Sequence, residues 1–92
     1  MKIGFIGMGR MGKNMVLRLL QKKHKVVAHN RSPEPIKEVA KKGAIAAYNL
    51  DEFFSRLEKP RVVWLMLPAG DVTEQHIQKI KPYLTPGDIL VD

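Results

Sequence analysis

The sequence has 92 residues, of which 45% are hydrophobic, with sixteen lysines and arginines against nine aspartates and glutamates and no cysteine. This length suits one small domain and excludes a self-contained enzyme with separate cofactor and substrate lobes. The hydrophobic content excludes a disordered polycation, and the lack of thiols excludes a disulfide framework or a thiolate metal site. No apolar run reaches the ~18–20 residues of a membrane span, and a glycine motif from residue 7 leaves no room for a signal peptide. We therefore expect a soluble, cytoplasmic domain.

The net charge of +7 is concentrated in the first half of the chain. Residues 1–50 hold eleven basic and two acidic side chains, whereas residues 51–92 hold five basic and seven acidic ones. A basic half indicates an anionic partner, and solvated lysines on helix faces are an equally good interpretation.

Short apolar runs alternate with segments of helical periodicity, which is typical of βαβ units on a parallel sheet. We expect strands at residues 2–6, 25–29, 44–47, 62–67 and 89–91, and helices at about 11–22, 33–42, 50–58 and 72–80. Right-handed crossovers then give a Rossmann-like α/β fold, a doubly wound parallel sheet of order 3-2-1-4-5 in one domain, residues 1–92. Because such a fold seldom ends at its ligand crevice, we expect the sheet to be truncated after the fifth strand, as a piece of a larger protein.

Individual residues indicate where these elements begin, end and pack. Ser32 and Asn49 are N-cap candidates, Asp71 is predicted to cap the last helix, and Gly43 suits a left-handed stop. The apolar run at 62–67 favours a strand covered on both faces. The buried stripe of the first helix is predicted to consist of Met11, Met15, Val16, Leu19 and Leu20.

The run Gly7-Met8-Gly9-Arg10-Met11-Gly12 is a G-x-G-x-x-G that lies between a strand and a helix, the context of a dinucleotide site. Gly7 permits a tight turn, Gly9 lets a pyrophosphate approach the backbone, and Gly12 lets the helix pack close to the strand. The phosphates would lie against unpaired N–H groups at the positive end of the helix dipole. We therefore predict that residues 7–12 bind a dinucleotide.

The end of the second strand bears on which dinucleotide is bound. An NAD-selective site places Asp or Glu there, about 20 residues after the first glycine, to accept from the ribose 2′-OH. This chain has Asn30-Arg31-Ser32, beginning 23 residues after Gly7, so no carboxylate repels a 2′-phosphate. Asn30 can hydrogen-bond the ribose, Arg31 offers a planar fork to phosphate oxygens, and the Ser32 hydroxyl either binds phosphate or caps the helix. We predict NADP as the cofactor, with NAD as the alternative.

The loop that leaves the fourth strand is the third candidate segment, because ligands of such sheets lie beyond the carboxyl ends of the strands. We predict that Leu67, Pro68 and Ala69 flank the nicotinamide side of the cofactor, with an ordinary strand-to-helix turn as the alternative. The three histidines lack the spacing of a metal triad, so we expect no metal site.

The glycine motif with its methionine, together with Asn-Arg-Ser after the second strand, resembles the β-hydroxyacid dehydrogenase superfamily. The runs 60–70 and 86–92 narrow the resemblance to decarboxylating 6-phosphogluconate dehydrogenase, especially its short bacterial type, over the whole chain. The resemblance implies a pyrophosphate loop at 7–12 with Met11 touching the nicotinamide, a 2′-phosphate site at 30–32, and residues 67–69 over the nicotinamide ribose.

The sequence departs from the family pattern at three places. Lys23 stands where many members have glycine, so the helix stop there would use another residue; Pro68 stands where some have lysine; and many short-type relatives carry an acidic residue after the second strand.

The resemblance implies an oxidoreductase that transfers hydride from 6-phosphogluconate to NADP and then releases CO2, giving ribulose 5-phosphate in the pentose phosphate pathway. The family's catalytic residues follow residue 92, beside an all-helical domain, so this chain is expected to supply cofactor binding and no catalytic group. Expected partners of the full-length protein are the cofactor, a phosphorylated sugar acid and further copies of the same chain, without a membrane or nucleic acid. A 3-hydroxyisobutyrate-like dehydrogenase and a non-catalytic nucleotide-sensing module are the alternatives. Nucleic-acid binding is disfavoured because the basic residues lie at helix ends without interleaved aromatic side chains.

Overall fold

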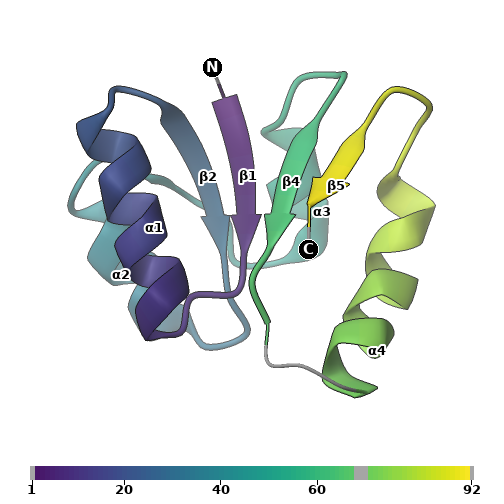
Figure 1. The fold of residues 1–92 in the computed structure, drawn as a ribbon, viewed down its shortest axis with the longest axis horizontal. Helices are drawn as coiled ribbons and strands as arrows, with labels where there is room; N and C mark the ends of the chain where they lie inside the picture. Colours follow the sequence, from purple (N-terminus) through teal and green to yellow (C-terminus); the bar gives the residue numbers. More distant parts are fainter. Residues whose placement is uncertain (1, 68–70, 92) are drawn as a thin grey trace.

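The computed structural model describes residues 2–67 and 71–91, with side chains described for 2–67 and 74–91. The elements alternate between strands and helices along the chain (Figure 1). They are β1 (Lys2–Ile6), α1 (Arg10–Gln21), β2 (Lys25–His29), α2 (Pro33–Ala40), β3 (Ile45–Ala46), α3 (Leu50–Ser55), β4 (Val62–Leu65), α4 (Asp71–Ile80), the 3-10 helix η1 (Lys81–Tyr83) and β5 (Ile89–Val91). The predicted strand order is confirmed, because the five strands form one sheet in the order β3-β2-β1-β4-β5 with every pairing parallel.

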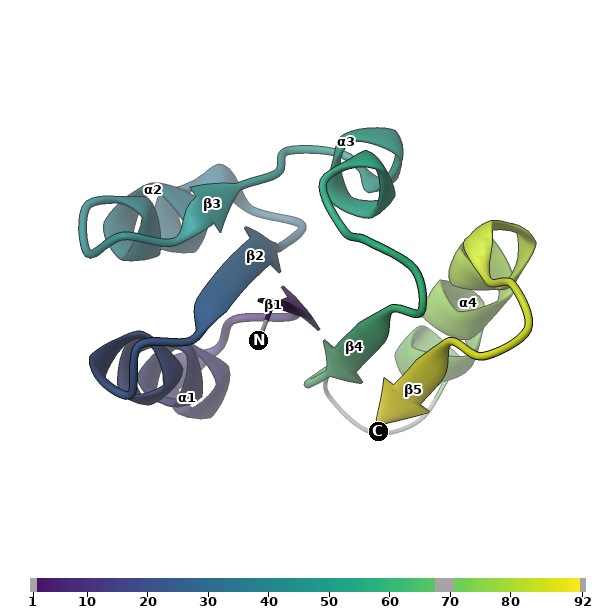
Figure 2. The same ribbon diagram turned by 90° about the horizontal axis from the view of Figure 1, so that it is seen from above.

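The sheet separates two apolar clusters, because side chains along a strand point alternately to its two faces. Phe5 and Val26 belong to the cluster beneath α1 and α2, whereas Ile6 and Val27 belong to the cluster beneath α3 and α4. Viewed along the strands, the two helix pairs lie on opposite sides of the sheet (Figure 2). Because every strand pairing is parallel, the carboxyl ends of the strands lie together at one edge of the sheet.

The strand β4 is covered less completely than its apolar sequence indicates. Val63 and Leu65 are buried in the cluster beneath α3 and α4, but Val62 and Trp64 on the other face are only half-buried. The Trp64 ring stacks on Phe5, with ring centres 6.4 Å apart and planes 4° from parallel. The strand is also shorter than the predicted run 62–67. The expectation of cover on both faces was therefore wrong for one face.

Helix α1 ends in a left-handed turn without a glycine. The Lys23 N–H donates to the Leu20 carbonyl at 3.0 Å, and the His24 N–H donates to the Leu19 carbonyl at 3.1 Å. This pair of bonds is the Schellman arrangement, which requires a left-handed residue after the helix. Lys23 supplies it with a φ of 67°. The expectation that another residue would take this role was wrong.

Helix α2 ends in the same arrangement, with glycine in the turning position. The Gly43 N–H donates to Ala40 and the Ala44 N–H donates to Val39, each at 3.1 Å, and Gly43 has a φ of 110°. The predicted left-handed stop at Gly43 is confirmed. The ends of α1 and α2 therefore share one hydrogen-bond arrangement, in which the left-handed residue is Lys23 in one and Gly43 in the other.

The helix starts agree with the sequence in part. The Asn49 side chain accepts from the Glu52 N–H at 2.8 Å, so this cap is confirmed. Ser32 occupies the N-cap position of α2, but its side chain makes no capping hydrogen bond. Asp71 is the first residue of α4, and its side chain lies outside the described part of the chain, so its capping role stays a prediction. Met11 was wrongly assigned to the buried stripe of α1, because it is 69% exposed.

A buried ion pair joins the starts of β4 and β5. The Asp88 side chain, 1% exposed, accepts from the backbone N–H of Arg61 at 2.7 Å and of Thr85 at 3.0 Å. Arg61 Nη1 lies 3.3 Å from the carboxylate and also donates to the Tyr83 carbonyl at 2.9 Å. The two backbone donors, helped by the Arg61 and Thr85 side chains, lower the pKa of Asp88 to about 2.

We expect Lys23→Gly to raise the free energy of unfolding by about 0.5–1 kcal/mol. A side chain in the left-handed region costs ~1–2 kcal/mol, and the greater backbone entropy lost by glycine offsets about half of this gain. Urea unfolding monitored by circular dichroism measures the change. The matched variant Gly43→Ala should lower the free energy by about 1 kcal/mol. An unfolding midpoint of Lys23→Gly at or below that of the wild type would contradict the expectation.

We expect the Asp88 carboxylate to stabilise the fold above pH 4 and to lose this contribution as the pH falls from about 4 to about 2. The pKa of Asp88 is about 2 in the folded chain and 3.8 without these partners, so the unfolded chain binds the proton more tightly. Protonation therefore favours unfolding as the pH falls through this range. Asp88→Asn should lower stability at pH 7 by about 2 kcal/mol, the range for hydrogen bonds to a charged group. It should also flatten the loss of stability between pH 4 and pH 2 in urea titrations. Glu38→Gln, at an exposed ion pair, is the control that should leave this acid dependence in place.

Candidate dinucleotide site

The glycine loop after β1 is built from backbone contacts that exclude side chains. Gly7 has a φ of 95°, and a Cβ there would overlap the Met66 carbonyl oxygen. A Cβ on Gly12 would overlap the Gly7 carbonyl oxygen, so α1 packs directly on the turn. Gly9 differs, because no atom of the described residues, its chain neighbours aside, lies within 4 Å of its Cβ position. The tight turn and the close helix packing predicted for Gly7 and Gly12 are therefore found, and the space beside Gly9 faces outward.

The N-terminus of α1 leaves backbone donors open beside Gly9. The first bond within the helix runs from the Lys13 N–H to the Gly9 carbonyl at 2.9 Å. No side chain caps the helix, and its first turn has no acidic residue. The N–H groups of Arg10, Met11 and Gly12 thus lie before the first helical hydrogen bond. Together with the helix dipole, such groups favour an anion at this end of α1.

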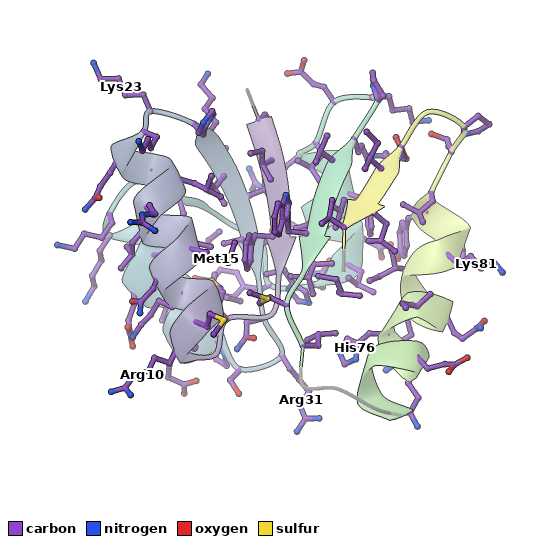
Figure 3. The ribbon with its side chains drawn as sticks, viewed as in Figure 1. Arg10, Met15, Lys23, Arg31, His76 and Lys81 are labelled. Atoms are coloured by element: carbon purple, nitrogen blue, oxygen red, sulfur yellow. The ribbon has the colours of Figure 1, made fainter. Side chains whose placement is uncertain are left out.

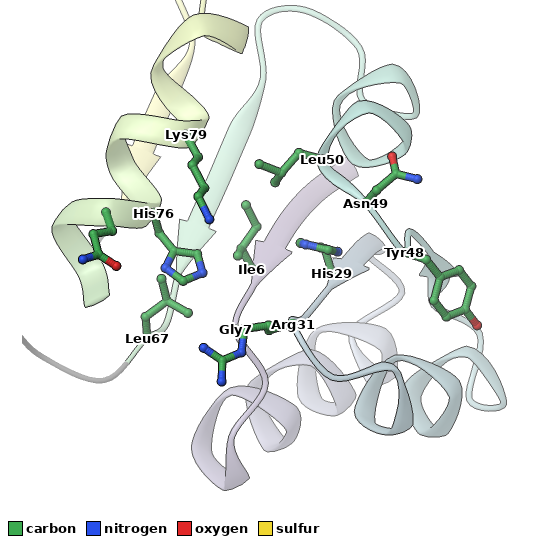
Figure 4. Close-up of a pocket in the computed structure, with 11 residues that line it drawn as sticks. Ile6, Gly7, His29, Arg31, Tyr48, Asn49, Leu50, Leu67, His76 and Lys79 are labelled. Carbon is green, nitrogen blue, oxygen red and sulfur yellow. The ribbon is translucent and has the colours of Figure 1, made fainter. Parts of the chain in front are cut away.

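Two adjoining cavities open at the carboxyl edge of the sheet. The first, about 430 Å³, lies between the glycine loop, the β2–α2 turn, the end of β4 and α4. The second, about 380 Å³, lies between the ends of β1 and β2, the β3–α3 turn and α4 (Figure 4). Both cavities are lined by Gly7, Arg31, Leu67 and His76. A ligand that fills both would therefore contact these shared residues.

The structure brings most of the predicted site residues to the first cavity. Its lining includes Gly7, Met8, Gly9, Asn30, Arg31, Ser32 and Leu67. The side chain of Met11 is placed elsewhere, in a groove on the outer side of α1 with Met15 and Arg18. Arg10 and Gly12 do not line the cavities. They can contribute to a ligand site through their backbone N–H groups at the start of α1. Pro68 and Ala69 lie outside the described residues.

The cavities have a basic lining. Arg31 lines both of them, Lys79 lines the second, and no Asp or Glu within 2–67 and 74–91 lines either. Figure 3 shows Arg31 at the carboxyl end of the sheet, at the opposite end from Lys23. Such a lining favours a polyanionic ligand. The contribution of α4 was not among the predictions, although Gln75, His76 and Lys79 have the spacing of one helix face.

His29, the last residue of β2, lies beside the second cavity. Its Nδ1 lies 2.9 Å from the Ala47 carbonyl, a bond in which the ring nitrogen donates. The ring packs against Phe53 with centres 6.2 Å apart, and it borders the cavity (Figure 4). His29 is therefore held by the protein on one side and forms part of the cavity wall on the other.

The Asn30 side chain makes contacts that the sequence did not reveal. Its Oδ1 accepts from the Met8 N–H at 2.8 Å, and its Nδ2 donates to the Ser32 carbonyl at 3.1 Å. In the structure it joins the glycine loop to the turn before α2. That this amide can also bond the ribose of a ligand stays a prediction.

Two further searches cover only the part of the chain that the structure describes. Within it, no three His, Asp or Glu side chains gather in a way that could hold a metal ion. Likewise, none of its helices combines the length and the apolar character needed to cross a membrane.

Comparison with known proteins places this site in a family. Residues 2–92 match the family model described as the NAD binding domain of 6-phosphogluconate dehydrogenase. The chain is 44% identical over 95 residues to a decarboxylating 6-phosphogluconate dehydrogenase of Haemophilus influenzae, covering 98% of this chain and 20% of that protein. It is 38% identical over 92 residues to an NAD(+)-dependent decarboxylating enzyme of Haloferax volcanii, covering 100% of this chain and 31% of that protein.

A solved structure agrees with the sequence comparison. The chain superposes on a Plasmodium falciparum 6-phosphogluconate dehydrogenase, described in its apo form and in complex with NADP+ and with 6-phosphogluconate, with a TM-score of 0.88 and 30% identity. The match covers 98% of this chain and 21% of that one. The chain thus spans about a fifth of the length of two of these relatives. Its glycine loop, its sheet order and its match from residue 2 to residue 92 show that it belongs to the family of the NAD binding domain of 6-phosphogluconate dehydrogenase.

Proposed function

We propose that this domain binds NADP and presents it to the active site of a longer protein that oxidises and decarboxylates 6-phosphogluconate. The observation that carries the choice of cofactor is the position of Arg31 and Ser32 beside the glycine loop, in one cavity without a described carboxylate. A 2′-phosphate is the group that separates NADP from NAD, and a guanidinium is well suited to bind it. The solved relative from Plasmodium falciparum, in complex with NADP+, supports the same choice.

The residues present fit the parts of such a ligand. The open space beside Gly9, next to the N–H groups of Arg10, Met11 and Gly12, suits the pyrophosphate. The Ser32 hydroxyl makes no capping hydrogen bond and is free to join Arg31 at the 2′-phosphate. The second cavity has apolar walls from Ile6 and Leu50, which suit the adenine ring.

When bound, NADP supplies the hydride acceptor, and this chain's residues bind and orient it. Leu67, Pro68 and Ala69, with Met11, remain our prediction for the nicotinamide side. The oxidation and loss of CO2, the binding of the sugar acid, assembly with further copies and a cytoplasmic location are proposed for the longer protein. We assign no catalytic group to residues 1–92.

Cofactor choice has to be judged from this chain's own residues. The relative from Haloferax volcanii is described as NAD(+)-dependent, so the family includes proteins for either dinucleotide. A domain that prefers NAD needs an acceptor for the ribose 2′-OH after β2. Here Asn30 stands at that position, and its oxygen already accepts from Met8.

We expect Arg31→Ala to weaken NADP binding by roughly ten- to a hundredfold and to change NAD binding little. A charge-assisted hydrogen bond contributes about 1.5–3 kcal/mol, and only NADP carries the phosphate that receives it. Calorimetric titration of the chain with each dinucleotide measures both affinities. Arg56→Ala, at an exposed arginine after α3 that lines neither cavity, is the control. An equal loss for both dinucleotides would refute the role of Arg31, and wild-type chain that binds neither would refute the proposal.

We expect Gly9→Ala and Gly12→Ala to have opposite consequences. The Cβ at Gly9 meets no atom of the described part of the chain beyond its neighbours, so Gly9→Ala should fold with unchanged stability. By filling ligand space, it should weaken the binding of either dinucleotide at least about tenfold. The Cβ at Gly12 would overlap the Gly7 carbonyl oxygen, so Gly12→Ala should lower the free energy of unfolding by about 1–3 kcal/mol. Thermal unfolding and titration distinguish the two. Full cofactor affinity in Gly9→Ala would place the pyrophosphate elsewhere.

A further inference from the structure

We infer that Asn30 is a positioning residue, whose side-chain amide fixes the separation of the pyrophosphate loop from the 2′-phosphate loop and thereby sets the preference for NADP. The inference rests on the proposed function. It begins with the ladder between β1 and β2, whose register ends at Ile6 and His29. Beyond the register, the Gly7 N–H donates to the His29 carbonyl at 3.0 Å, and the next N–H, of Met8, donates to Asn30 Oδ1 at 2.8 Å.

The Asn30 side chain thus replaces a backbone acceptor where the two chains diverge. The glycine loop has left the strand, so the backbone of residue 30 is not the partner of Met8. The side-chain oxygen instead joins the two segments at this point. Met8 is 3% exposed, so its N–H loses access to much of the solvent that could replace this bond. An unpaired buried donor is costly, which makes Asn30 the residue that holds the loop in place.

The other end of the same amide holds the second loop. Asn30 Nδ2 donates to the Ser32 carbonyl at 3.1 Å, at the residue before α2. Arg31 lies between Asn30 and this tethered carbonyl, so the backbone from which its guanidinium extends is fixed on both sides. One planar group therefore contacts both loops that line the first cavity.

This arrangement matters for a ligand that carries phosphates at both positions. The covalent structure of NADP sets the spacing of its pyrophosphate and its 2′-phosphate, so loops held at a fixed separation bind it with less ordering cost. NAD has only the pyrophosphate, and it gains less from the fixed separation. Asn30 Oδ1 also carries no negative charge and already accepts from Met8, so it is a weaker acceptor for the ribose 2′-OH of NAD than a carboxylate after β2. Both effects favour NADP.

The test measures amide hydrogen exchange by NMR in the ligand-free chain, together with affinities for NADP and NAD. In Asn30→Ala, we expect exchange at the Met8 N–H to accelerate at least about tenfold relative to the amides of β2. We expect NADP affinity to fall about tenfold and NAD affinity to fall by less, so that the ratio of the two affinities shrinks. Asp88→Asn, at the opposite edge of the sheet, is the control for general destabilisation. It should affect Met8 no more than other amides and leave the ratio unchanged.

Asn30→Asp separates the two contacts, and it carries the test if Asn30→Ala does not fold. A carboxylate keeps an acceptor for the Met8 N–H but has no donor for the Ser32 carbonyl and repels a 2′-phosphate. We expect protection of the Met8 amide to persist, NADP affinity to fall more than about tenfold, and NAD affinity to stay within about threefold. Loss of Met8 protection in this variant would overturn the role of Oδ1.

Failure of the inference and failure of the proposed function give different results. If the wild type binds NADP but Asn30→Ala leaves Met8 exchange and the NADP-to-NAD ratio unchanged, the positioning role is overturned and the proposed function stands. If the wild type binds neither dinucleotide, both are overturned.

Discussion

The close approach of three backbone segments around the glycine loop is the constraint on which the rest of the site depends. The turn at Gly7 lies against the carbonyl of Met66, and the first turn of α1 lies against the carbonyl of Gly7. Since no Cβ fits at Gly7 or Gly12, the amino end of α1 is held beside the end of β4 at the carboxyl edge of the sheet. Its open N–H groups therefore face the same space as the loops that follow β2 and β4. Elsewhere the sheet tolerates less complete packing, as the half-buried Trp64 shows, without disturbing this arrangement.

Basic side chains have different partners at the two edges of the sheet, where the carboxyl ends and the amino ends of the strands lie. At the carboxyl edge, Arg31 and Lys79 line cavities without a described carboxylate, so their charge is available to a ligand. At the amino edge, the Arg61 charge is met within the protein, by Asp88 and by the Tyr83 carbonyl. The buried pair fastens β5 to β4 far from the glycine loop. For this reason, stability and cofactor binding are expected to respond to different residues, although the domain is small.

Much of the fold could be predicted from the sequence, because each element begins or ends with a residue whose conformational preference is local. Gly43 and the Asn49 cap are of this kind, and the strand order followed from the alternation of elements and the handedness of crossovers. The failures arise where the role of a residue depends on more than its own conformational preference or its spacing. Lys23 turns left-handed because two helix carbonyls need partners, and Met11 is exposed although its spacing fits the buried stripe. The lining from α4 was missed because a helix face becomes a cavity wall only when the loops opposite are in place.

Asn30 illustrates the same limit at the level of specificity. Read as a residue after β2, it is a neutral substitute for the carboxylate of an NAD site, and its amide could be assigned to the ribose. The hydrogen bonds to Met8 and Ser32 give that amide two partners within the chain, one in each of the loops that a dinucleotide must contact. Neutrality at this position then has two consequences. It leaves the field of Arg31 uncompensated, and it provides both a donor and an acceptor in one planar group, which a carboxylate cannot do. A change of cofactor preference in such a domain would therefore alter the geometry of the glycine loop as well as the charge beside the ribose.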